Sequence, residues 1–127
     1  MSHKVVVTGL GATTPIGGDV PTTWANALKG VSGIKKLEDS WVEEYQLPVY
    51  IAGRVAEDPL ESGRLTKVEA KRQDPSGRLA LVAAREAWAD AGFTGDDAET
   101  SEGVTPEKTA VAFGTGIGGV WTLLDAW

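Results

Sequence analysis

Two short apolar runs lie near the two ends of the chain, and each is followed by a glycine-rich connection. Lys4–Thr8 is a β-branched run that ends at Gly9, and Thr109–Phe113 ends at Gly114. Runs of this length without polar alternation are typical of strands buried on both faces of a parallel sheet. The first run therefore predicts such a strand and the second run predicts a further strand, each leading through a glycine loop into a helix.

The helix after the first glycine loop is bounded by local signals. Pro21 suits the first turn of a helix and Gly30 suits its end. Between them, Trp24 and Leu28 lie four residues apart and therefore share one face. We expect an amphipathic helix here.

The longest predicted helix begins at Asp74 and Pro75 and ends before Gly92. Aspartate accepts hydrogen bonds from the free amides of the first turn, and proline lacks the amide that would be left unpaired. Apolar residues occupy most of the helix surface, so we expect it to contact more than one neighbour. The charged residues that share the remaining arc are Arg78, Arg85, Glu86 and Asp90.

The other segments give weaker signals. Val31–Gln46 is irregular, whereas Pro48–Val55 is expected to be extended. Residues 94–107 are acidic and small, without apolar periodicity, which predicts a solvated loop. A further helix is expected to begin at Val120. The order of strand, glycine loop and helix predicts an α/β fold.

Composition limits the classes of function. The 127 residues, 42% of them hydrophobic, suffice for one globular domain. A net charge of -6, from 12 basic and 18 acidic residues, argues against general nucleic-acid binding. Because the sequence contains neither a secretory signal nor an apolar run of about 20 residues, we expect a soluble cytoplasmic protein without membrane contact.

Several kinds of catalytic or metal site are also excluded or disfavoured. The chain has no cysteine, which excludes disulfides, thiolate metal ligands and a cysteine nucleophile within these residues. A serine hydrolase is disfavoured because the Gly-x-Ser-x-Gly motif is missing and the one histidine is His3, expected to be a mobile end. No spacing suggests a metal site. The acidic pairs are expected to be solvated surface: Glu43–Glu44, Glu57–Asp58 and Asp96–Asp97.

The two glycine loops lie where a dinucleotide fingerprint would lie. Gly9-x-Gly11 has Thr14 in place of the third small residue, whereas Gly114-x-Gly116-x-x-Gly119 has the expected spacing. The acidic ribose ligand, expected about 20 residues later, would fall beyond Trp127. Glycines that let a strand turn sharply under a helix explain both loops without a ligand. A stand-alone nucleotide-binding or interaction domain of the α/β class is therefore an alternative.

A local excess of positive charge lies between residues 64 and 78. Two acidic residues, Glu69 and Asp74, and five basic residues give this stretch a net charge of +3. The basic residues are Arg64, Lys67, Lys71, Arg72 and Arg78. Spacings of three and four put Arg64, Lys67 and Lys71 on one face of a short helix. This face is either an ordinary solvated surface or a docking site for an acidic partner.

Three motifs in order resemble the N-terminal part of bacterial β-ketoacyl-acyl-carrier-protein synthases, the elongating condensing enzymes of fatty acid synthesis. The motifs are Val-Val-Val-Thr-Gly-Leu-Gly-Ala-Thr-Thr-Pro-Ile-Gly-Gly (residues 5–18), Gly-Val-Ser-Gly-Ile (residues 30–34) and Phe-Gly-Thr-Gly-Ile-Gly-Gly (residues 113–119). The resemblance implies a thiolase-like α/β fold, of which residues 1–127 would be the N-terminal portion of the first half. Type II polyketide ketosynthases and their chain-length factors share these loops and are a second alternative.

The resemblance also implies a reaction and site residues. The family condenses an acyl group, held on a cysteine, with malonyl-acyl carrier protein after decarboxylation assisted by two histidines. Those residues are expected beyond Trp127, so the chain would be truncated before the catalytic cysteine and inactive alone. The intact enzyme is expected to be a homodimer without a cofactor. By the family's pattern, Gly116, Ile117 and Gly118 line the acyl-chain pocket, and Lys67, Lys71 and Arg72 bind acyl carrier protein.

Overall fold

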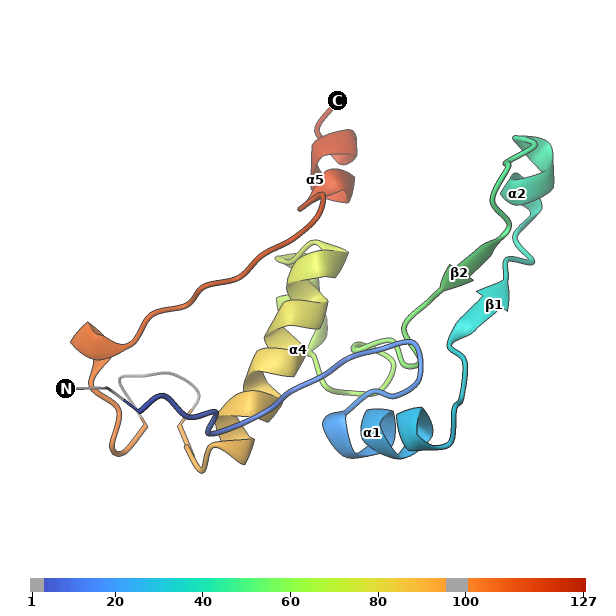
Figure 1. Ribbon diagram of the computed structural model, residues 1–127. Coiled ribbons are helices and arrows are strands. Elements are labelled where there is room, and N and C mark those ends of the chain that lie inside the picture. The colour runs from blue at the N-terminus through green and yellow to red at the C-terminus, as the bar shows by residue number, and fades with distance from the viewer. Residues whose placement is uncertain (1–3, 96–100) are drawn as a thin grey trace. The chain divides into compact units, whose positions relative to one another are not determined.

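The computed structural model describes residues 4–95 and 101–127 (Figure 1). The expectations for His3 and for Asp96–Asp97 lie outside these residues. The chain divides into two units, one made of Met1–Gly11 with Pro59–Trp127 and the other of Ala12–Asp58. Each unit is described by itself below.

The unit Ala12–Asp58 contains α1, Val20–Leu28, where the sequence predicts a helix. Asp19 caps α1 by accepting a hydrogen bond of 2.8 Å from the Thr22 N–H, and Pro21 lies in the first turn. These contacts satisfy an amide that has no partner inside the helix. The prediction of this helix is confirmed.

The same unit contains an antiparallel hairpin. Strand β1, Ile34–Lys36, pairs with β2, Ile51–Gly53, and Lys35 lies opposite Ala52. The short helix α2, Ser40–Glu44, lies between them in the sequence. The expected extended segment at Pro48–Val55 is thus confirmed in β2, whereas Val31–Gln46 contains regular elements that its pattern did not indicate.

The other unit is built on α4, Pro75–Asp90, which Asp74 caps. Its start and its end before Gly92 agree with the prediction. Before it lies the short helix α3, Lys67–Lys71, and after it come the 3-10 turn η1, Pro106–Lys108, and α5, Val120–Asp125. The predicted helix start at Val120 is confirmed.

The first glycines of the chain pack against α4. A Cβ atom built on Gly11 would lie 1.8 Å from the Ala83 carbonyl oxygen, and one on Gly9 would lie 2.1 Å from that of Ala87. Only glycine allows the backbone to approach a helix this closely. The Leu10 N–H also donates a hydrogen bond of 2.9 Å to the Asp90 carboxylate, so this segment follows α4 toward its beginning (Figure 1).

The two predicted strands are not formed. Lys4–Thr8 and Thr109–Phe113 are extended but unpaired, and Val5 and Val111 are each 93% exposed. A strand needs a neighbour for its N–H and C=O groups, and within the described residues the one sheet is the β1–β2 hairpin. The prediction of a strand buried on both faces at Lys4–Thr8, and that of a second strand at Thr109–Phe113, are therefore wrong for this structure. Helices with a two-stranded sheet are compatible with the α/β class.

The buried core is small. Among the residues that the structure describes, the buried hydrophobic side chains are Val42, Leu65, Ala70 and Val82. Large apolar side chains such as Trp24, Trp121 and Leu124 are more than half exposed. The longest described helix has 16 residues, and no helix in this part of the chain combines the length and hydropathy needed to cross a membrane.

Candidate functional site

The basic stretch forms its helix with the help of a reciprocal cap. In α3, the Thr66 hydroxyl oxygen accepts a hydrogen bond of 3.3 Å from the Glu69 N–H. The Glu69 carboxylate in turn accepts bonds of 2.8 Å from the Thr66 N–H and hydroxyl. A helix of five residues is unstable by itself, so such end contacts decide whether it forms.

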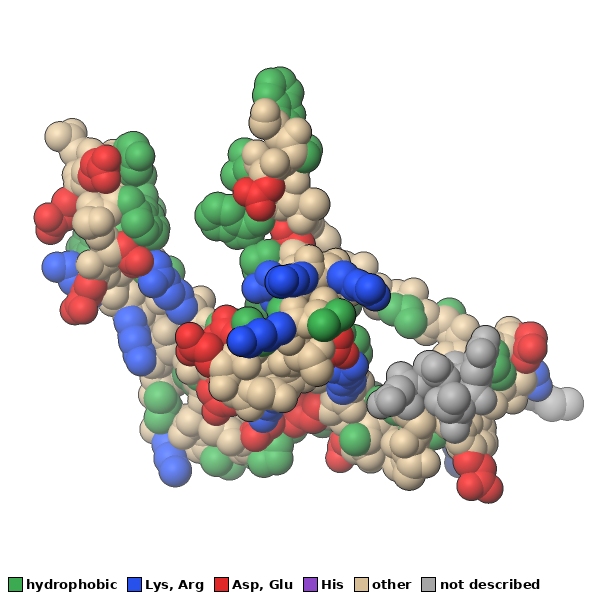
Figure 2. Space-filling model, turned by 180° about the vertical axis from the view of Figure 1, so that it is seen from behind, with side chains coloured by type: hydrophobic (Ala, Val, Ile, Leu, Met, Phe, Trp, Pro, Cys, Tyr) green, Lys and Arg blue, Asp and Glu red, His purple; other side chains and the backbone are tan. Residues whose placement is uncertain are grey.

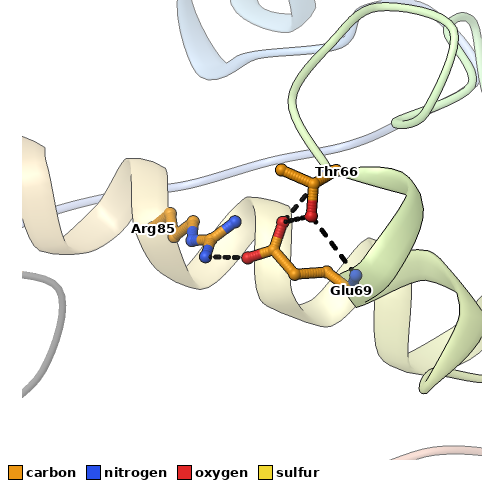
Figure 3. Close-up of polar contacts among 3 residues, drawn as sticks. All are labelled: Thr66, Glu69 and Arg85. Carbon is orange, nitrogen blue, oxygen red and sulfur yellow. Dashed lines mark hydrogen bonds and ion pairs between the residues drawn. The ribbon is translucent and has the colours of Figure 1, made fainter.

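Glu69 also joins α3 to α4. Its carboxylate forms an ion pair with the Arg85 guanidinium, as Figure 3 shows together with the Thr66 contacts. Hydrogen bonds from Arg85 and then from Thr66 lower the pKa of Glu69 from its usual 4.5 to about 2. Glu69 is therefore ionised at neutral pH, and its negative charge is paired with Arg85.

The far end of α3 is closed by Arg78. Its Nε donates hydrogen bonds of 3.0 Å to the Ala70 carbonyl oxygen and 3.1 Å to that of Gln73. The last carbonyl groups of a helix have no partner inside it, and a cation is favoured there. Arg78, counted with the basic stretch in the sequence, thus acts on the backbone of α3.

The expected common face of Arg64, Lys67 and Lys71 is only partly formed. Arg64 precedes α3, which begins at Lys67, so it is not on the helix and that part of the prediction is wrong. Thr66 caps the helix and thereby stops it from extending back to Arg64. Lys67 and Lys71 lie four residues apart on α3, as expected.

The exposed cations of α3 and its end are Lys67, Lys71 and Arg72. Ala70 on the same helix is only 3% exposed, so the helix packs one side inward while these side chains reach solvent. None of the three has an ion-pair partner among the described residues. Figure 2 shows lysine and arginine side chains gathered in this region, over α3 and the beginning of α4.

The second glycine loop carries its one large side chain outward. Ile117 is 83% exposed, and open space surrounds the Cβ positions of Gly114 and Gly116. Gly118 has φ of +80°, a conformation that favours glycine, and its N–H donates a hydrogen bond of 3.0 Å to the Thr115 hydroxyl. No wall of an acyl pocket is formed around Ile117 by the described residues, and the predicted role of Gly116, Ile117 and Gly118 stays a prediction.

Asp74 connects this loop region to α4. One carboxylate oxygen accepts hydrogen bonds of 3.2 Å from the N–H and hydroxyl of Ser76, as the cap of α4. The other accepts bonds of 3.2 Å from the Thr122 N–H and 3.3 Å from its hydroxyl, in the first turn of α5. One side chain thus caps two helices.

These contacts argue against nucleotide binding. The close approach that Gly9 and Gly11 permit is made by α4, and a carboxylate is bound to the Thr122 amide at the helix start where a pyrophosphate would be bound. Within residues 4–95 and 101–127 no cluster of histidine, aspartate and glutamate could hold a metal ion.

The structure shows one helix start and two contacts that the sequence patterns above did not predict. Thr66-x-x-Glu69 is the signature of a capping box, so the start of α3 was detectable from the sequence. The contacts of Arg85 with Glu69 and of Thr122 with Asp74 join residues 16 and 48 positions apart, and no local pattern indicates them.

Comparisons with known proteins agree over nearly the whole chain. Residues 2–126 match the family model described as "Beta-ketoacyl synthase, N-terminal domain". The chain is 44% identical over 121 residues to 3-oxoacyl-acyl-carrier-protein synthase 2 of Staphylococcus aureus strain N315, covering 95% of this chain and 27% of that protein. It is 37% identical over 115 residues to the protein of the same name from Mycobacterium leprae strain TN, covering 91% of this chain and 25% of that protein.

The chain thus spans about a quarter of the length of these curated relatives. The similarity covers the first glycine loop, the basic helix and the second glycine loop together, since the family match includes all of them. The chain therefore belongs to the β-ketoacyl synthase family, in which it corresponds to the N-terminal domain.

Proposed function

We propose that this chain is the N-terminal part of a condensing enzyme that elongates acyl groups in fatty acid synthesis. The observation that carries the proposal is the 44% identity to a 3-oxoacyl-acyl-carrier-protein synthase 2 over 95% of the chain. The complete protein has the thiolase-like fold in this proposal, and the two extended segments 4–8 and 109–113 become strands once further chain supplies their neighbours.

The reaction proceeds in two transfers. An acyl group passes from its carrier thioester to a cysteine thiol of the enzyme, and the carrier leaves as a free thiol. Malonyl-acyl carrier protein then loses CO₂, and the resulting carbanion attacks the acyl thioester carbonyl and expels the cysteine thiolate. Because this chain has no cysteine and one histidine, His3, the nucleophile and the two assisting histidines belong to other parts of the enzyme.

We infer that Lys67, Lys71 and Arg72 bind the acidic acyl carrier protein. The Glu69–Arg85 pair and the Arg78 contacts hold α3 on α4, so these cations extend from a supported helix. Glu69, the acid on the same helix, is already paired and does not need to be neutralised by a lysine. A positive patch on a protein of net negative charge steers an acidic partner to one place.

Gly116, Ile117 and Gly118 form part of the acyl-chain pocket in this proposal. Ile117 is the one residue with a large side chain among them, and it is exposed, so it is available to contact segments outside this chain. Its bulk would limit how far an acyl chain extends. We further propose that the enzyme is a cytoplasmic homodimer.

The test is direct assay of a complete synthase that carries this chain as its N-terminal part. Incubation with an acyl-acyl carrier protein and malonyl-acyl carrier protein should yield the 3-oxoacyl product, lengthened by an acetyl unit, together with an equal amount of CO₂. Mass spectrometry of the carrier protein identifies the product. If no 3-oxoacyl product appears with any acyl length, while a known synthase forms it in parallel, the proposed function is wrong.

A further inference from the structure

Helix α5 begins without a cap of its own. Its N-cap residue is Gly119, which has no side chain to accept a hydrogen bond from the first turn. The free amides of a helix start need an acceptor, and aspartate is among the preferred ones. In this structure the acceptor is the carboxylate of Asp74, 48 residues before Thr122, which accepts hydrogen bonds from the Thr122 N–H and hydroxyl.

Asp74 is the main attachment of α5, the helix that directly follows the second glycine loop, to its unit. In the described part of the chain, two kinds of hydrogen bond join loop 114–119 and α5 to other segments. Asp74 accepts bonds from Thr122 of α5, and the Ser76 hydroxyl lies 3.5 Å from the Gly118 carbonyl oxygen of the loop. Gly114 and Gly116 have open space at their Cβ positions. The loop is therefore held at its C-terminal end, by Ser76 at Gly118 and by Asp74 through α5.

The electrostatics suit this arrangement. Burial raises the pKa of Asp74, but hydrogen bonds from Ser76 and Thr122 outweigh burial and hold the pKa below its usual value. The carboxylate is ionised at neutral pH, and a negative charge is favourable at the beginning of both α4 and α5. One carboxylate oxygen accepts hydrogen bonds from α4 and the other from α5, so the side chain is bonded to both helices at once.

We propose that Asp74 is a positioning residue for acyl-chain selection, which holds the loop that carries Ile117 by bonding α4 and α5 at once. This inference rests on the proposed function, because it gives Ile117 its place in the acyl pocket. If Asp74 holds the loop, the side chain at position 117 discriminates between acyl lengths only while that attachment is intact.

Two variants separate the attachment from the α4 cap. Serine is itself a preferred N-cap, but it is shorter and has one oxygen, so Asp74→Ser keeps an α4 cap and loses the bond to α5. Thr122→Val removes the hydroxyl bond to Asp74 but keeps the bond from the Thr122 backbone N–H, so it weakens the attachment and leaves Asp74 unchanged, while Thr122→Ser restores a hydroxyl. Asp19→Ser is the matched control, since it makes the same change at the aspartate cap of α1.

The experiment is a double-mutant cycle in a complete synthase that carries this chain. For each variant, with and without Ile117→Phe, kcat/KM is measured with a long and a short acyl-acyl carrier protein, and the long-to-short ratio is compared. In the parent, Ile117→Phe should lower this ratio strongly. With Asp74→Ser, we expect the effect of Ile117→Phe on this ratio to shrink by about fivefold, a size typical of residues in contact, and with Thr122→Val by a smaller factor. Thr122→Ser and Asp19→Ser should leave that effect unchanged.

The outcomes distinguish the two proposals. If the parent forms no 3-oxoacyl product, the proposed function and this inference both fail. If the parent elongates acyl groups but Ile117→Phe acts equally in all backgrounds, the proposed function stands and the positioning role of Asp74 is overturned. Melting curves accompany each variant, and loss of the folded enzyme in both Asp74→Ser and Thr122→Val would assign the contact to folding, which also overturns the inference.

Discussion

Glu69 and Arg85 form an ion pair that joins α3 to α4 across 16 positions of sequence. The same carboxylate closes the capping box of α3 through Thr66. Because one side chain serves both the helix start and its anchor, the orientation of the basic helix depends on the charge of Glu69.

The stability contributed by Glu69 should depend on pH. Its pKa falls from 4.5 to about 2, so its contribution is fully present above about pH 4.5 and is lost as the pH falls toward 2. In a complete synthase, Glu69→Gln should lower the melting temperature at neutral pH, and the difference from the parent should disappear on acidification through this window. Parallel melting curves over pH measure it, and a difference that does not change with pH would contradict the role of the charge.

Reversal of the basic patch should affect carrier-linked substrates alone. Lys71→Glu with Arg72→Glu should raise KM for acyl-acyl carrier protein at low salt, and the advantage of the parent should shrink once ionic strength brings the screening length below about 10 Å. A small thioester without the carrier should react almost normally, because the acyl pocket is unchanged.

The matched control reverses two adjacent exposed lysines of β1, in Lys35→Glu with Lys36→Glu. This pair makes the same change in net charge, and it should alter KM little if the effect is local to α3. Equal losses in both double variants would show that net charge is responsible. Equal losses on carrier-linked and carrier-free substrates would mean that α3 supports the fold.

Enlarging residue 117 should shorten the acyl range of a complete synthase. Ile117→Phe should reduce turnover of medium and long acyl substrates and spare short ones, since a larger side chain blocks the deeper part of a pocket. Kinetics over a series of acyl lengths measure the effect. A uniform loss over all lengths would indicate a structural role.

The packing of the first glycine loop on α4 should tolerate no added methyl group. Gly11→Ala places a Cβ 1.8 Å from the Ala83 carbonyl oxygen, and the resulting backbone shift should cost about 1–3 kcal/mol. Denaturant unfolding of a complete synthase measures the loss. Gly114→Ala, at a position surrounded by open space, is the control and should cost much less. Similar losses in both would contradict the observed packing.

The 127-residue chain by itself should associate or remain molten. Val5, Val111 and Ile117 are each more than 80% exposed, and the buried side chains of the described residues are few. Many exposed apolar side chains around a small core favour self-association. Light scattering, dye binding and calorimetry test this. A monodisperse 13.3 kDa monomer with a sharp cooperative melt would contradict it.

Local chemistry in the sequence determined the starts of α1 and α4. Pro21, and Asp74 with Pro75, predict the starts of α1 and α4 because these signals act within a few residues of themselves, and both helices are found there. The cap that Asp19 gives α1 in the structure is local in the same way. The motifs in order also determined the family, because residues 5–18 and 113–119 match it jointly and not by a single loop. The start of α3 belongs with these features, since Thr66 and Glu69 are close in sequence.

Only the tertiary structure decided the contacts between distant segments. Lys4–Thr8 has the composition of a buried strand, but pairing requires a neighbour, and in this structure its continuation packs on α4 through Gly9 and Gly11. In the sequence, Arg78 and Arg85 belong to the charged arc of one helix. In the structure, Arg78 donates to the Ala70 carbonyl oxygen of α3 and Arg85 pairs with the Glu69 carboxylate of α3. From the sequence, Asp74 is predicted to cap α4. It also caps α5, because a carboxylate has two oxygens and the fold brings Thr122 within hydrogen-bond distance of the second.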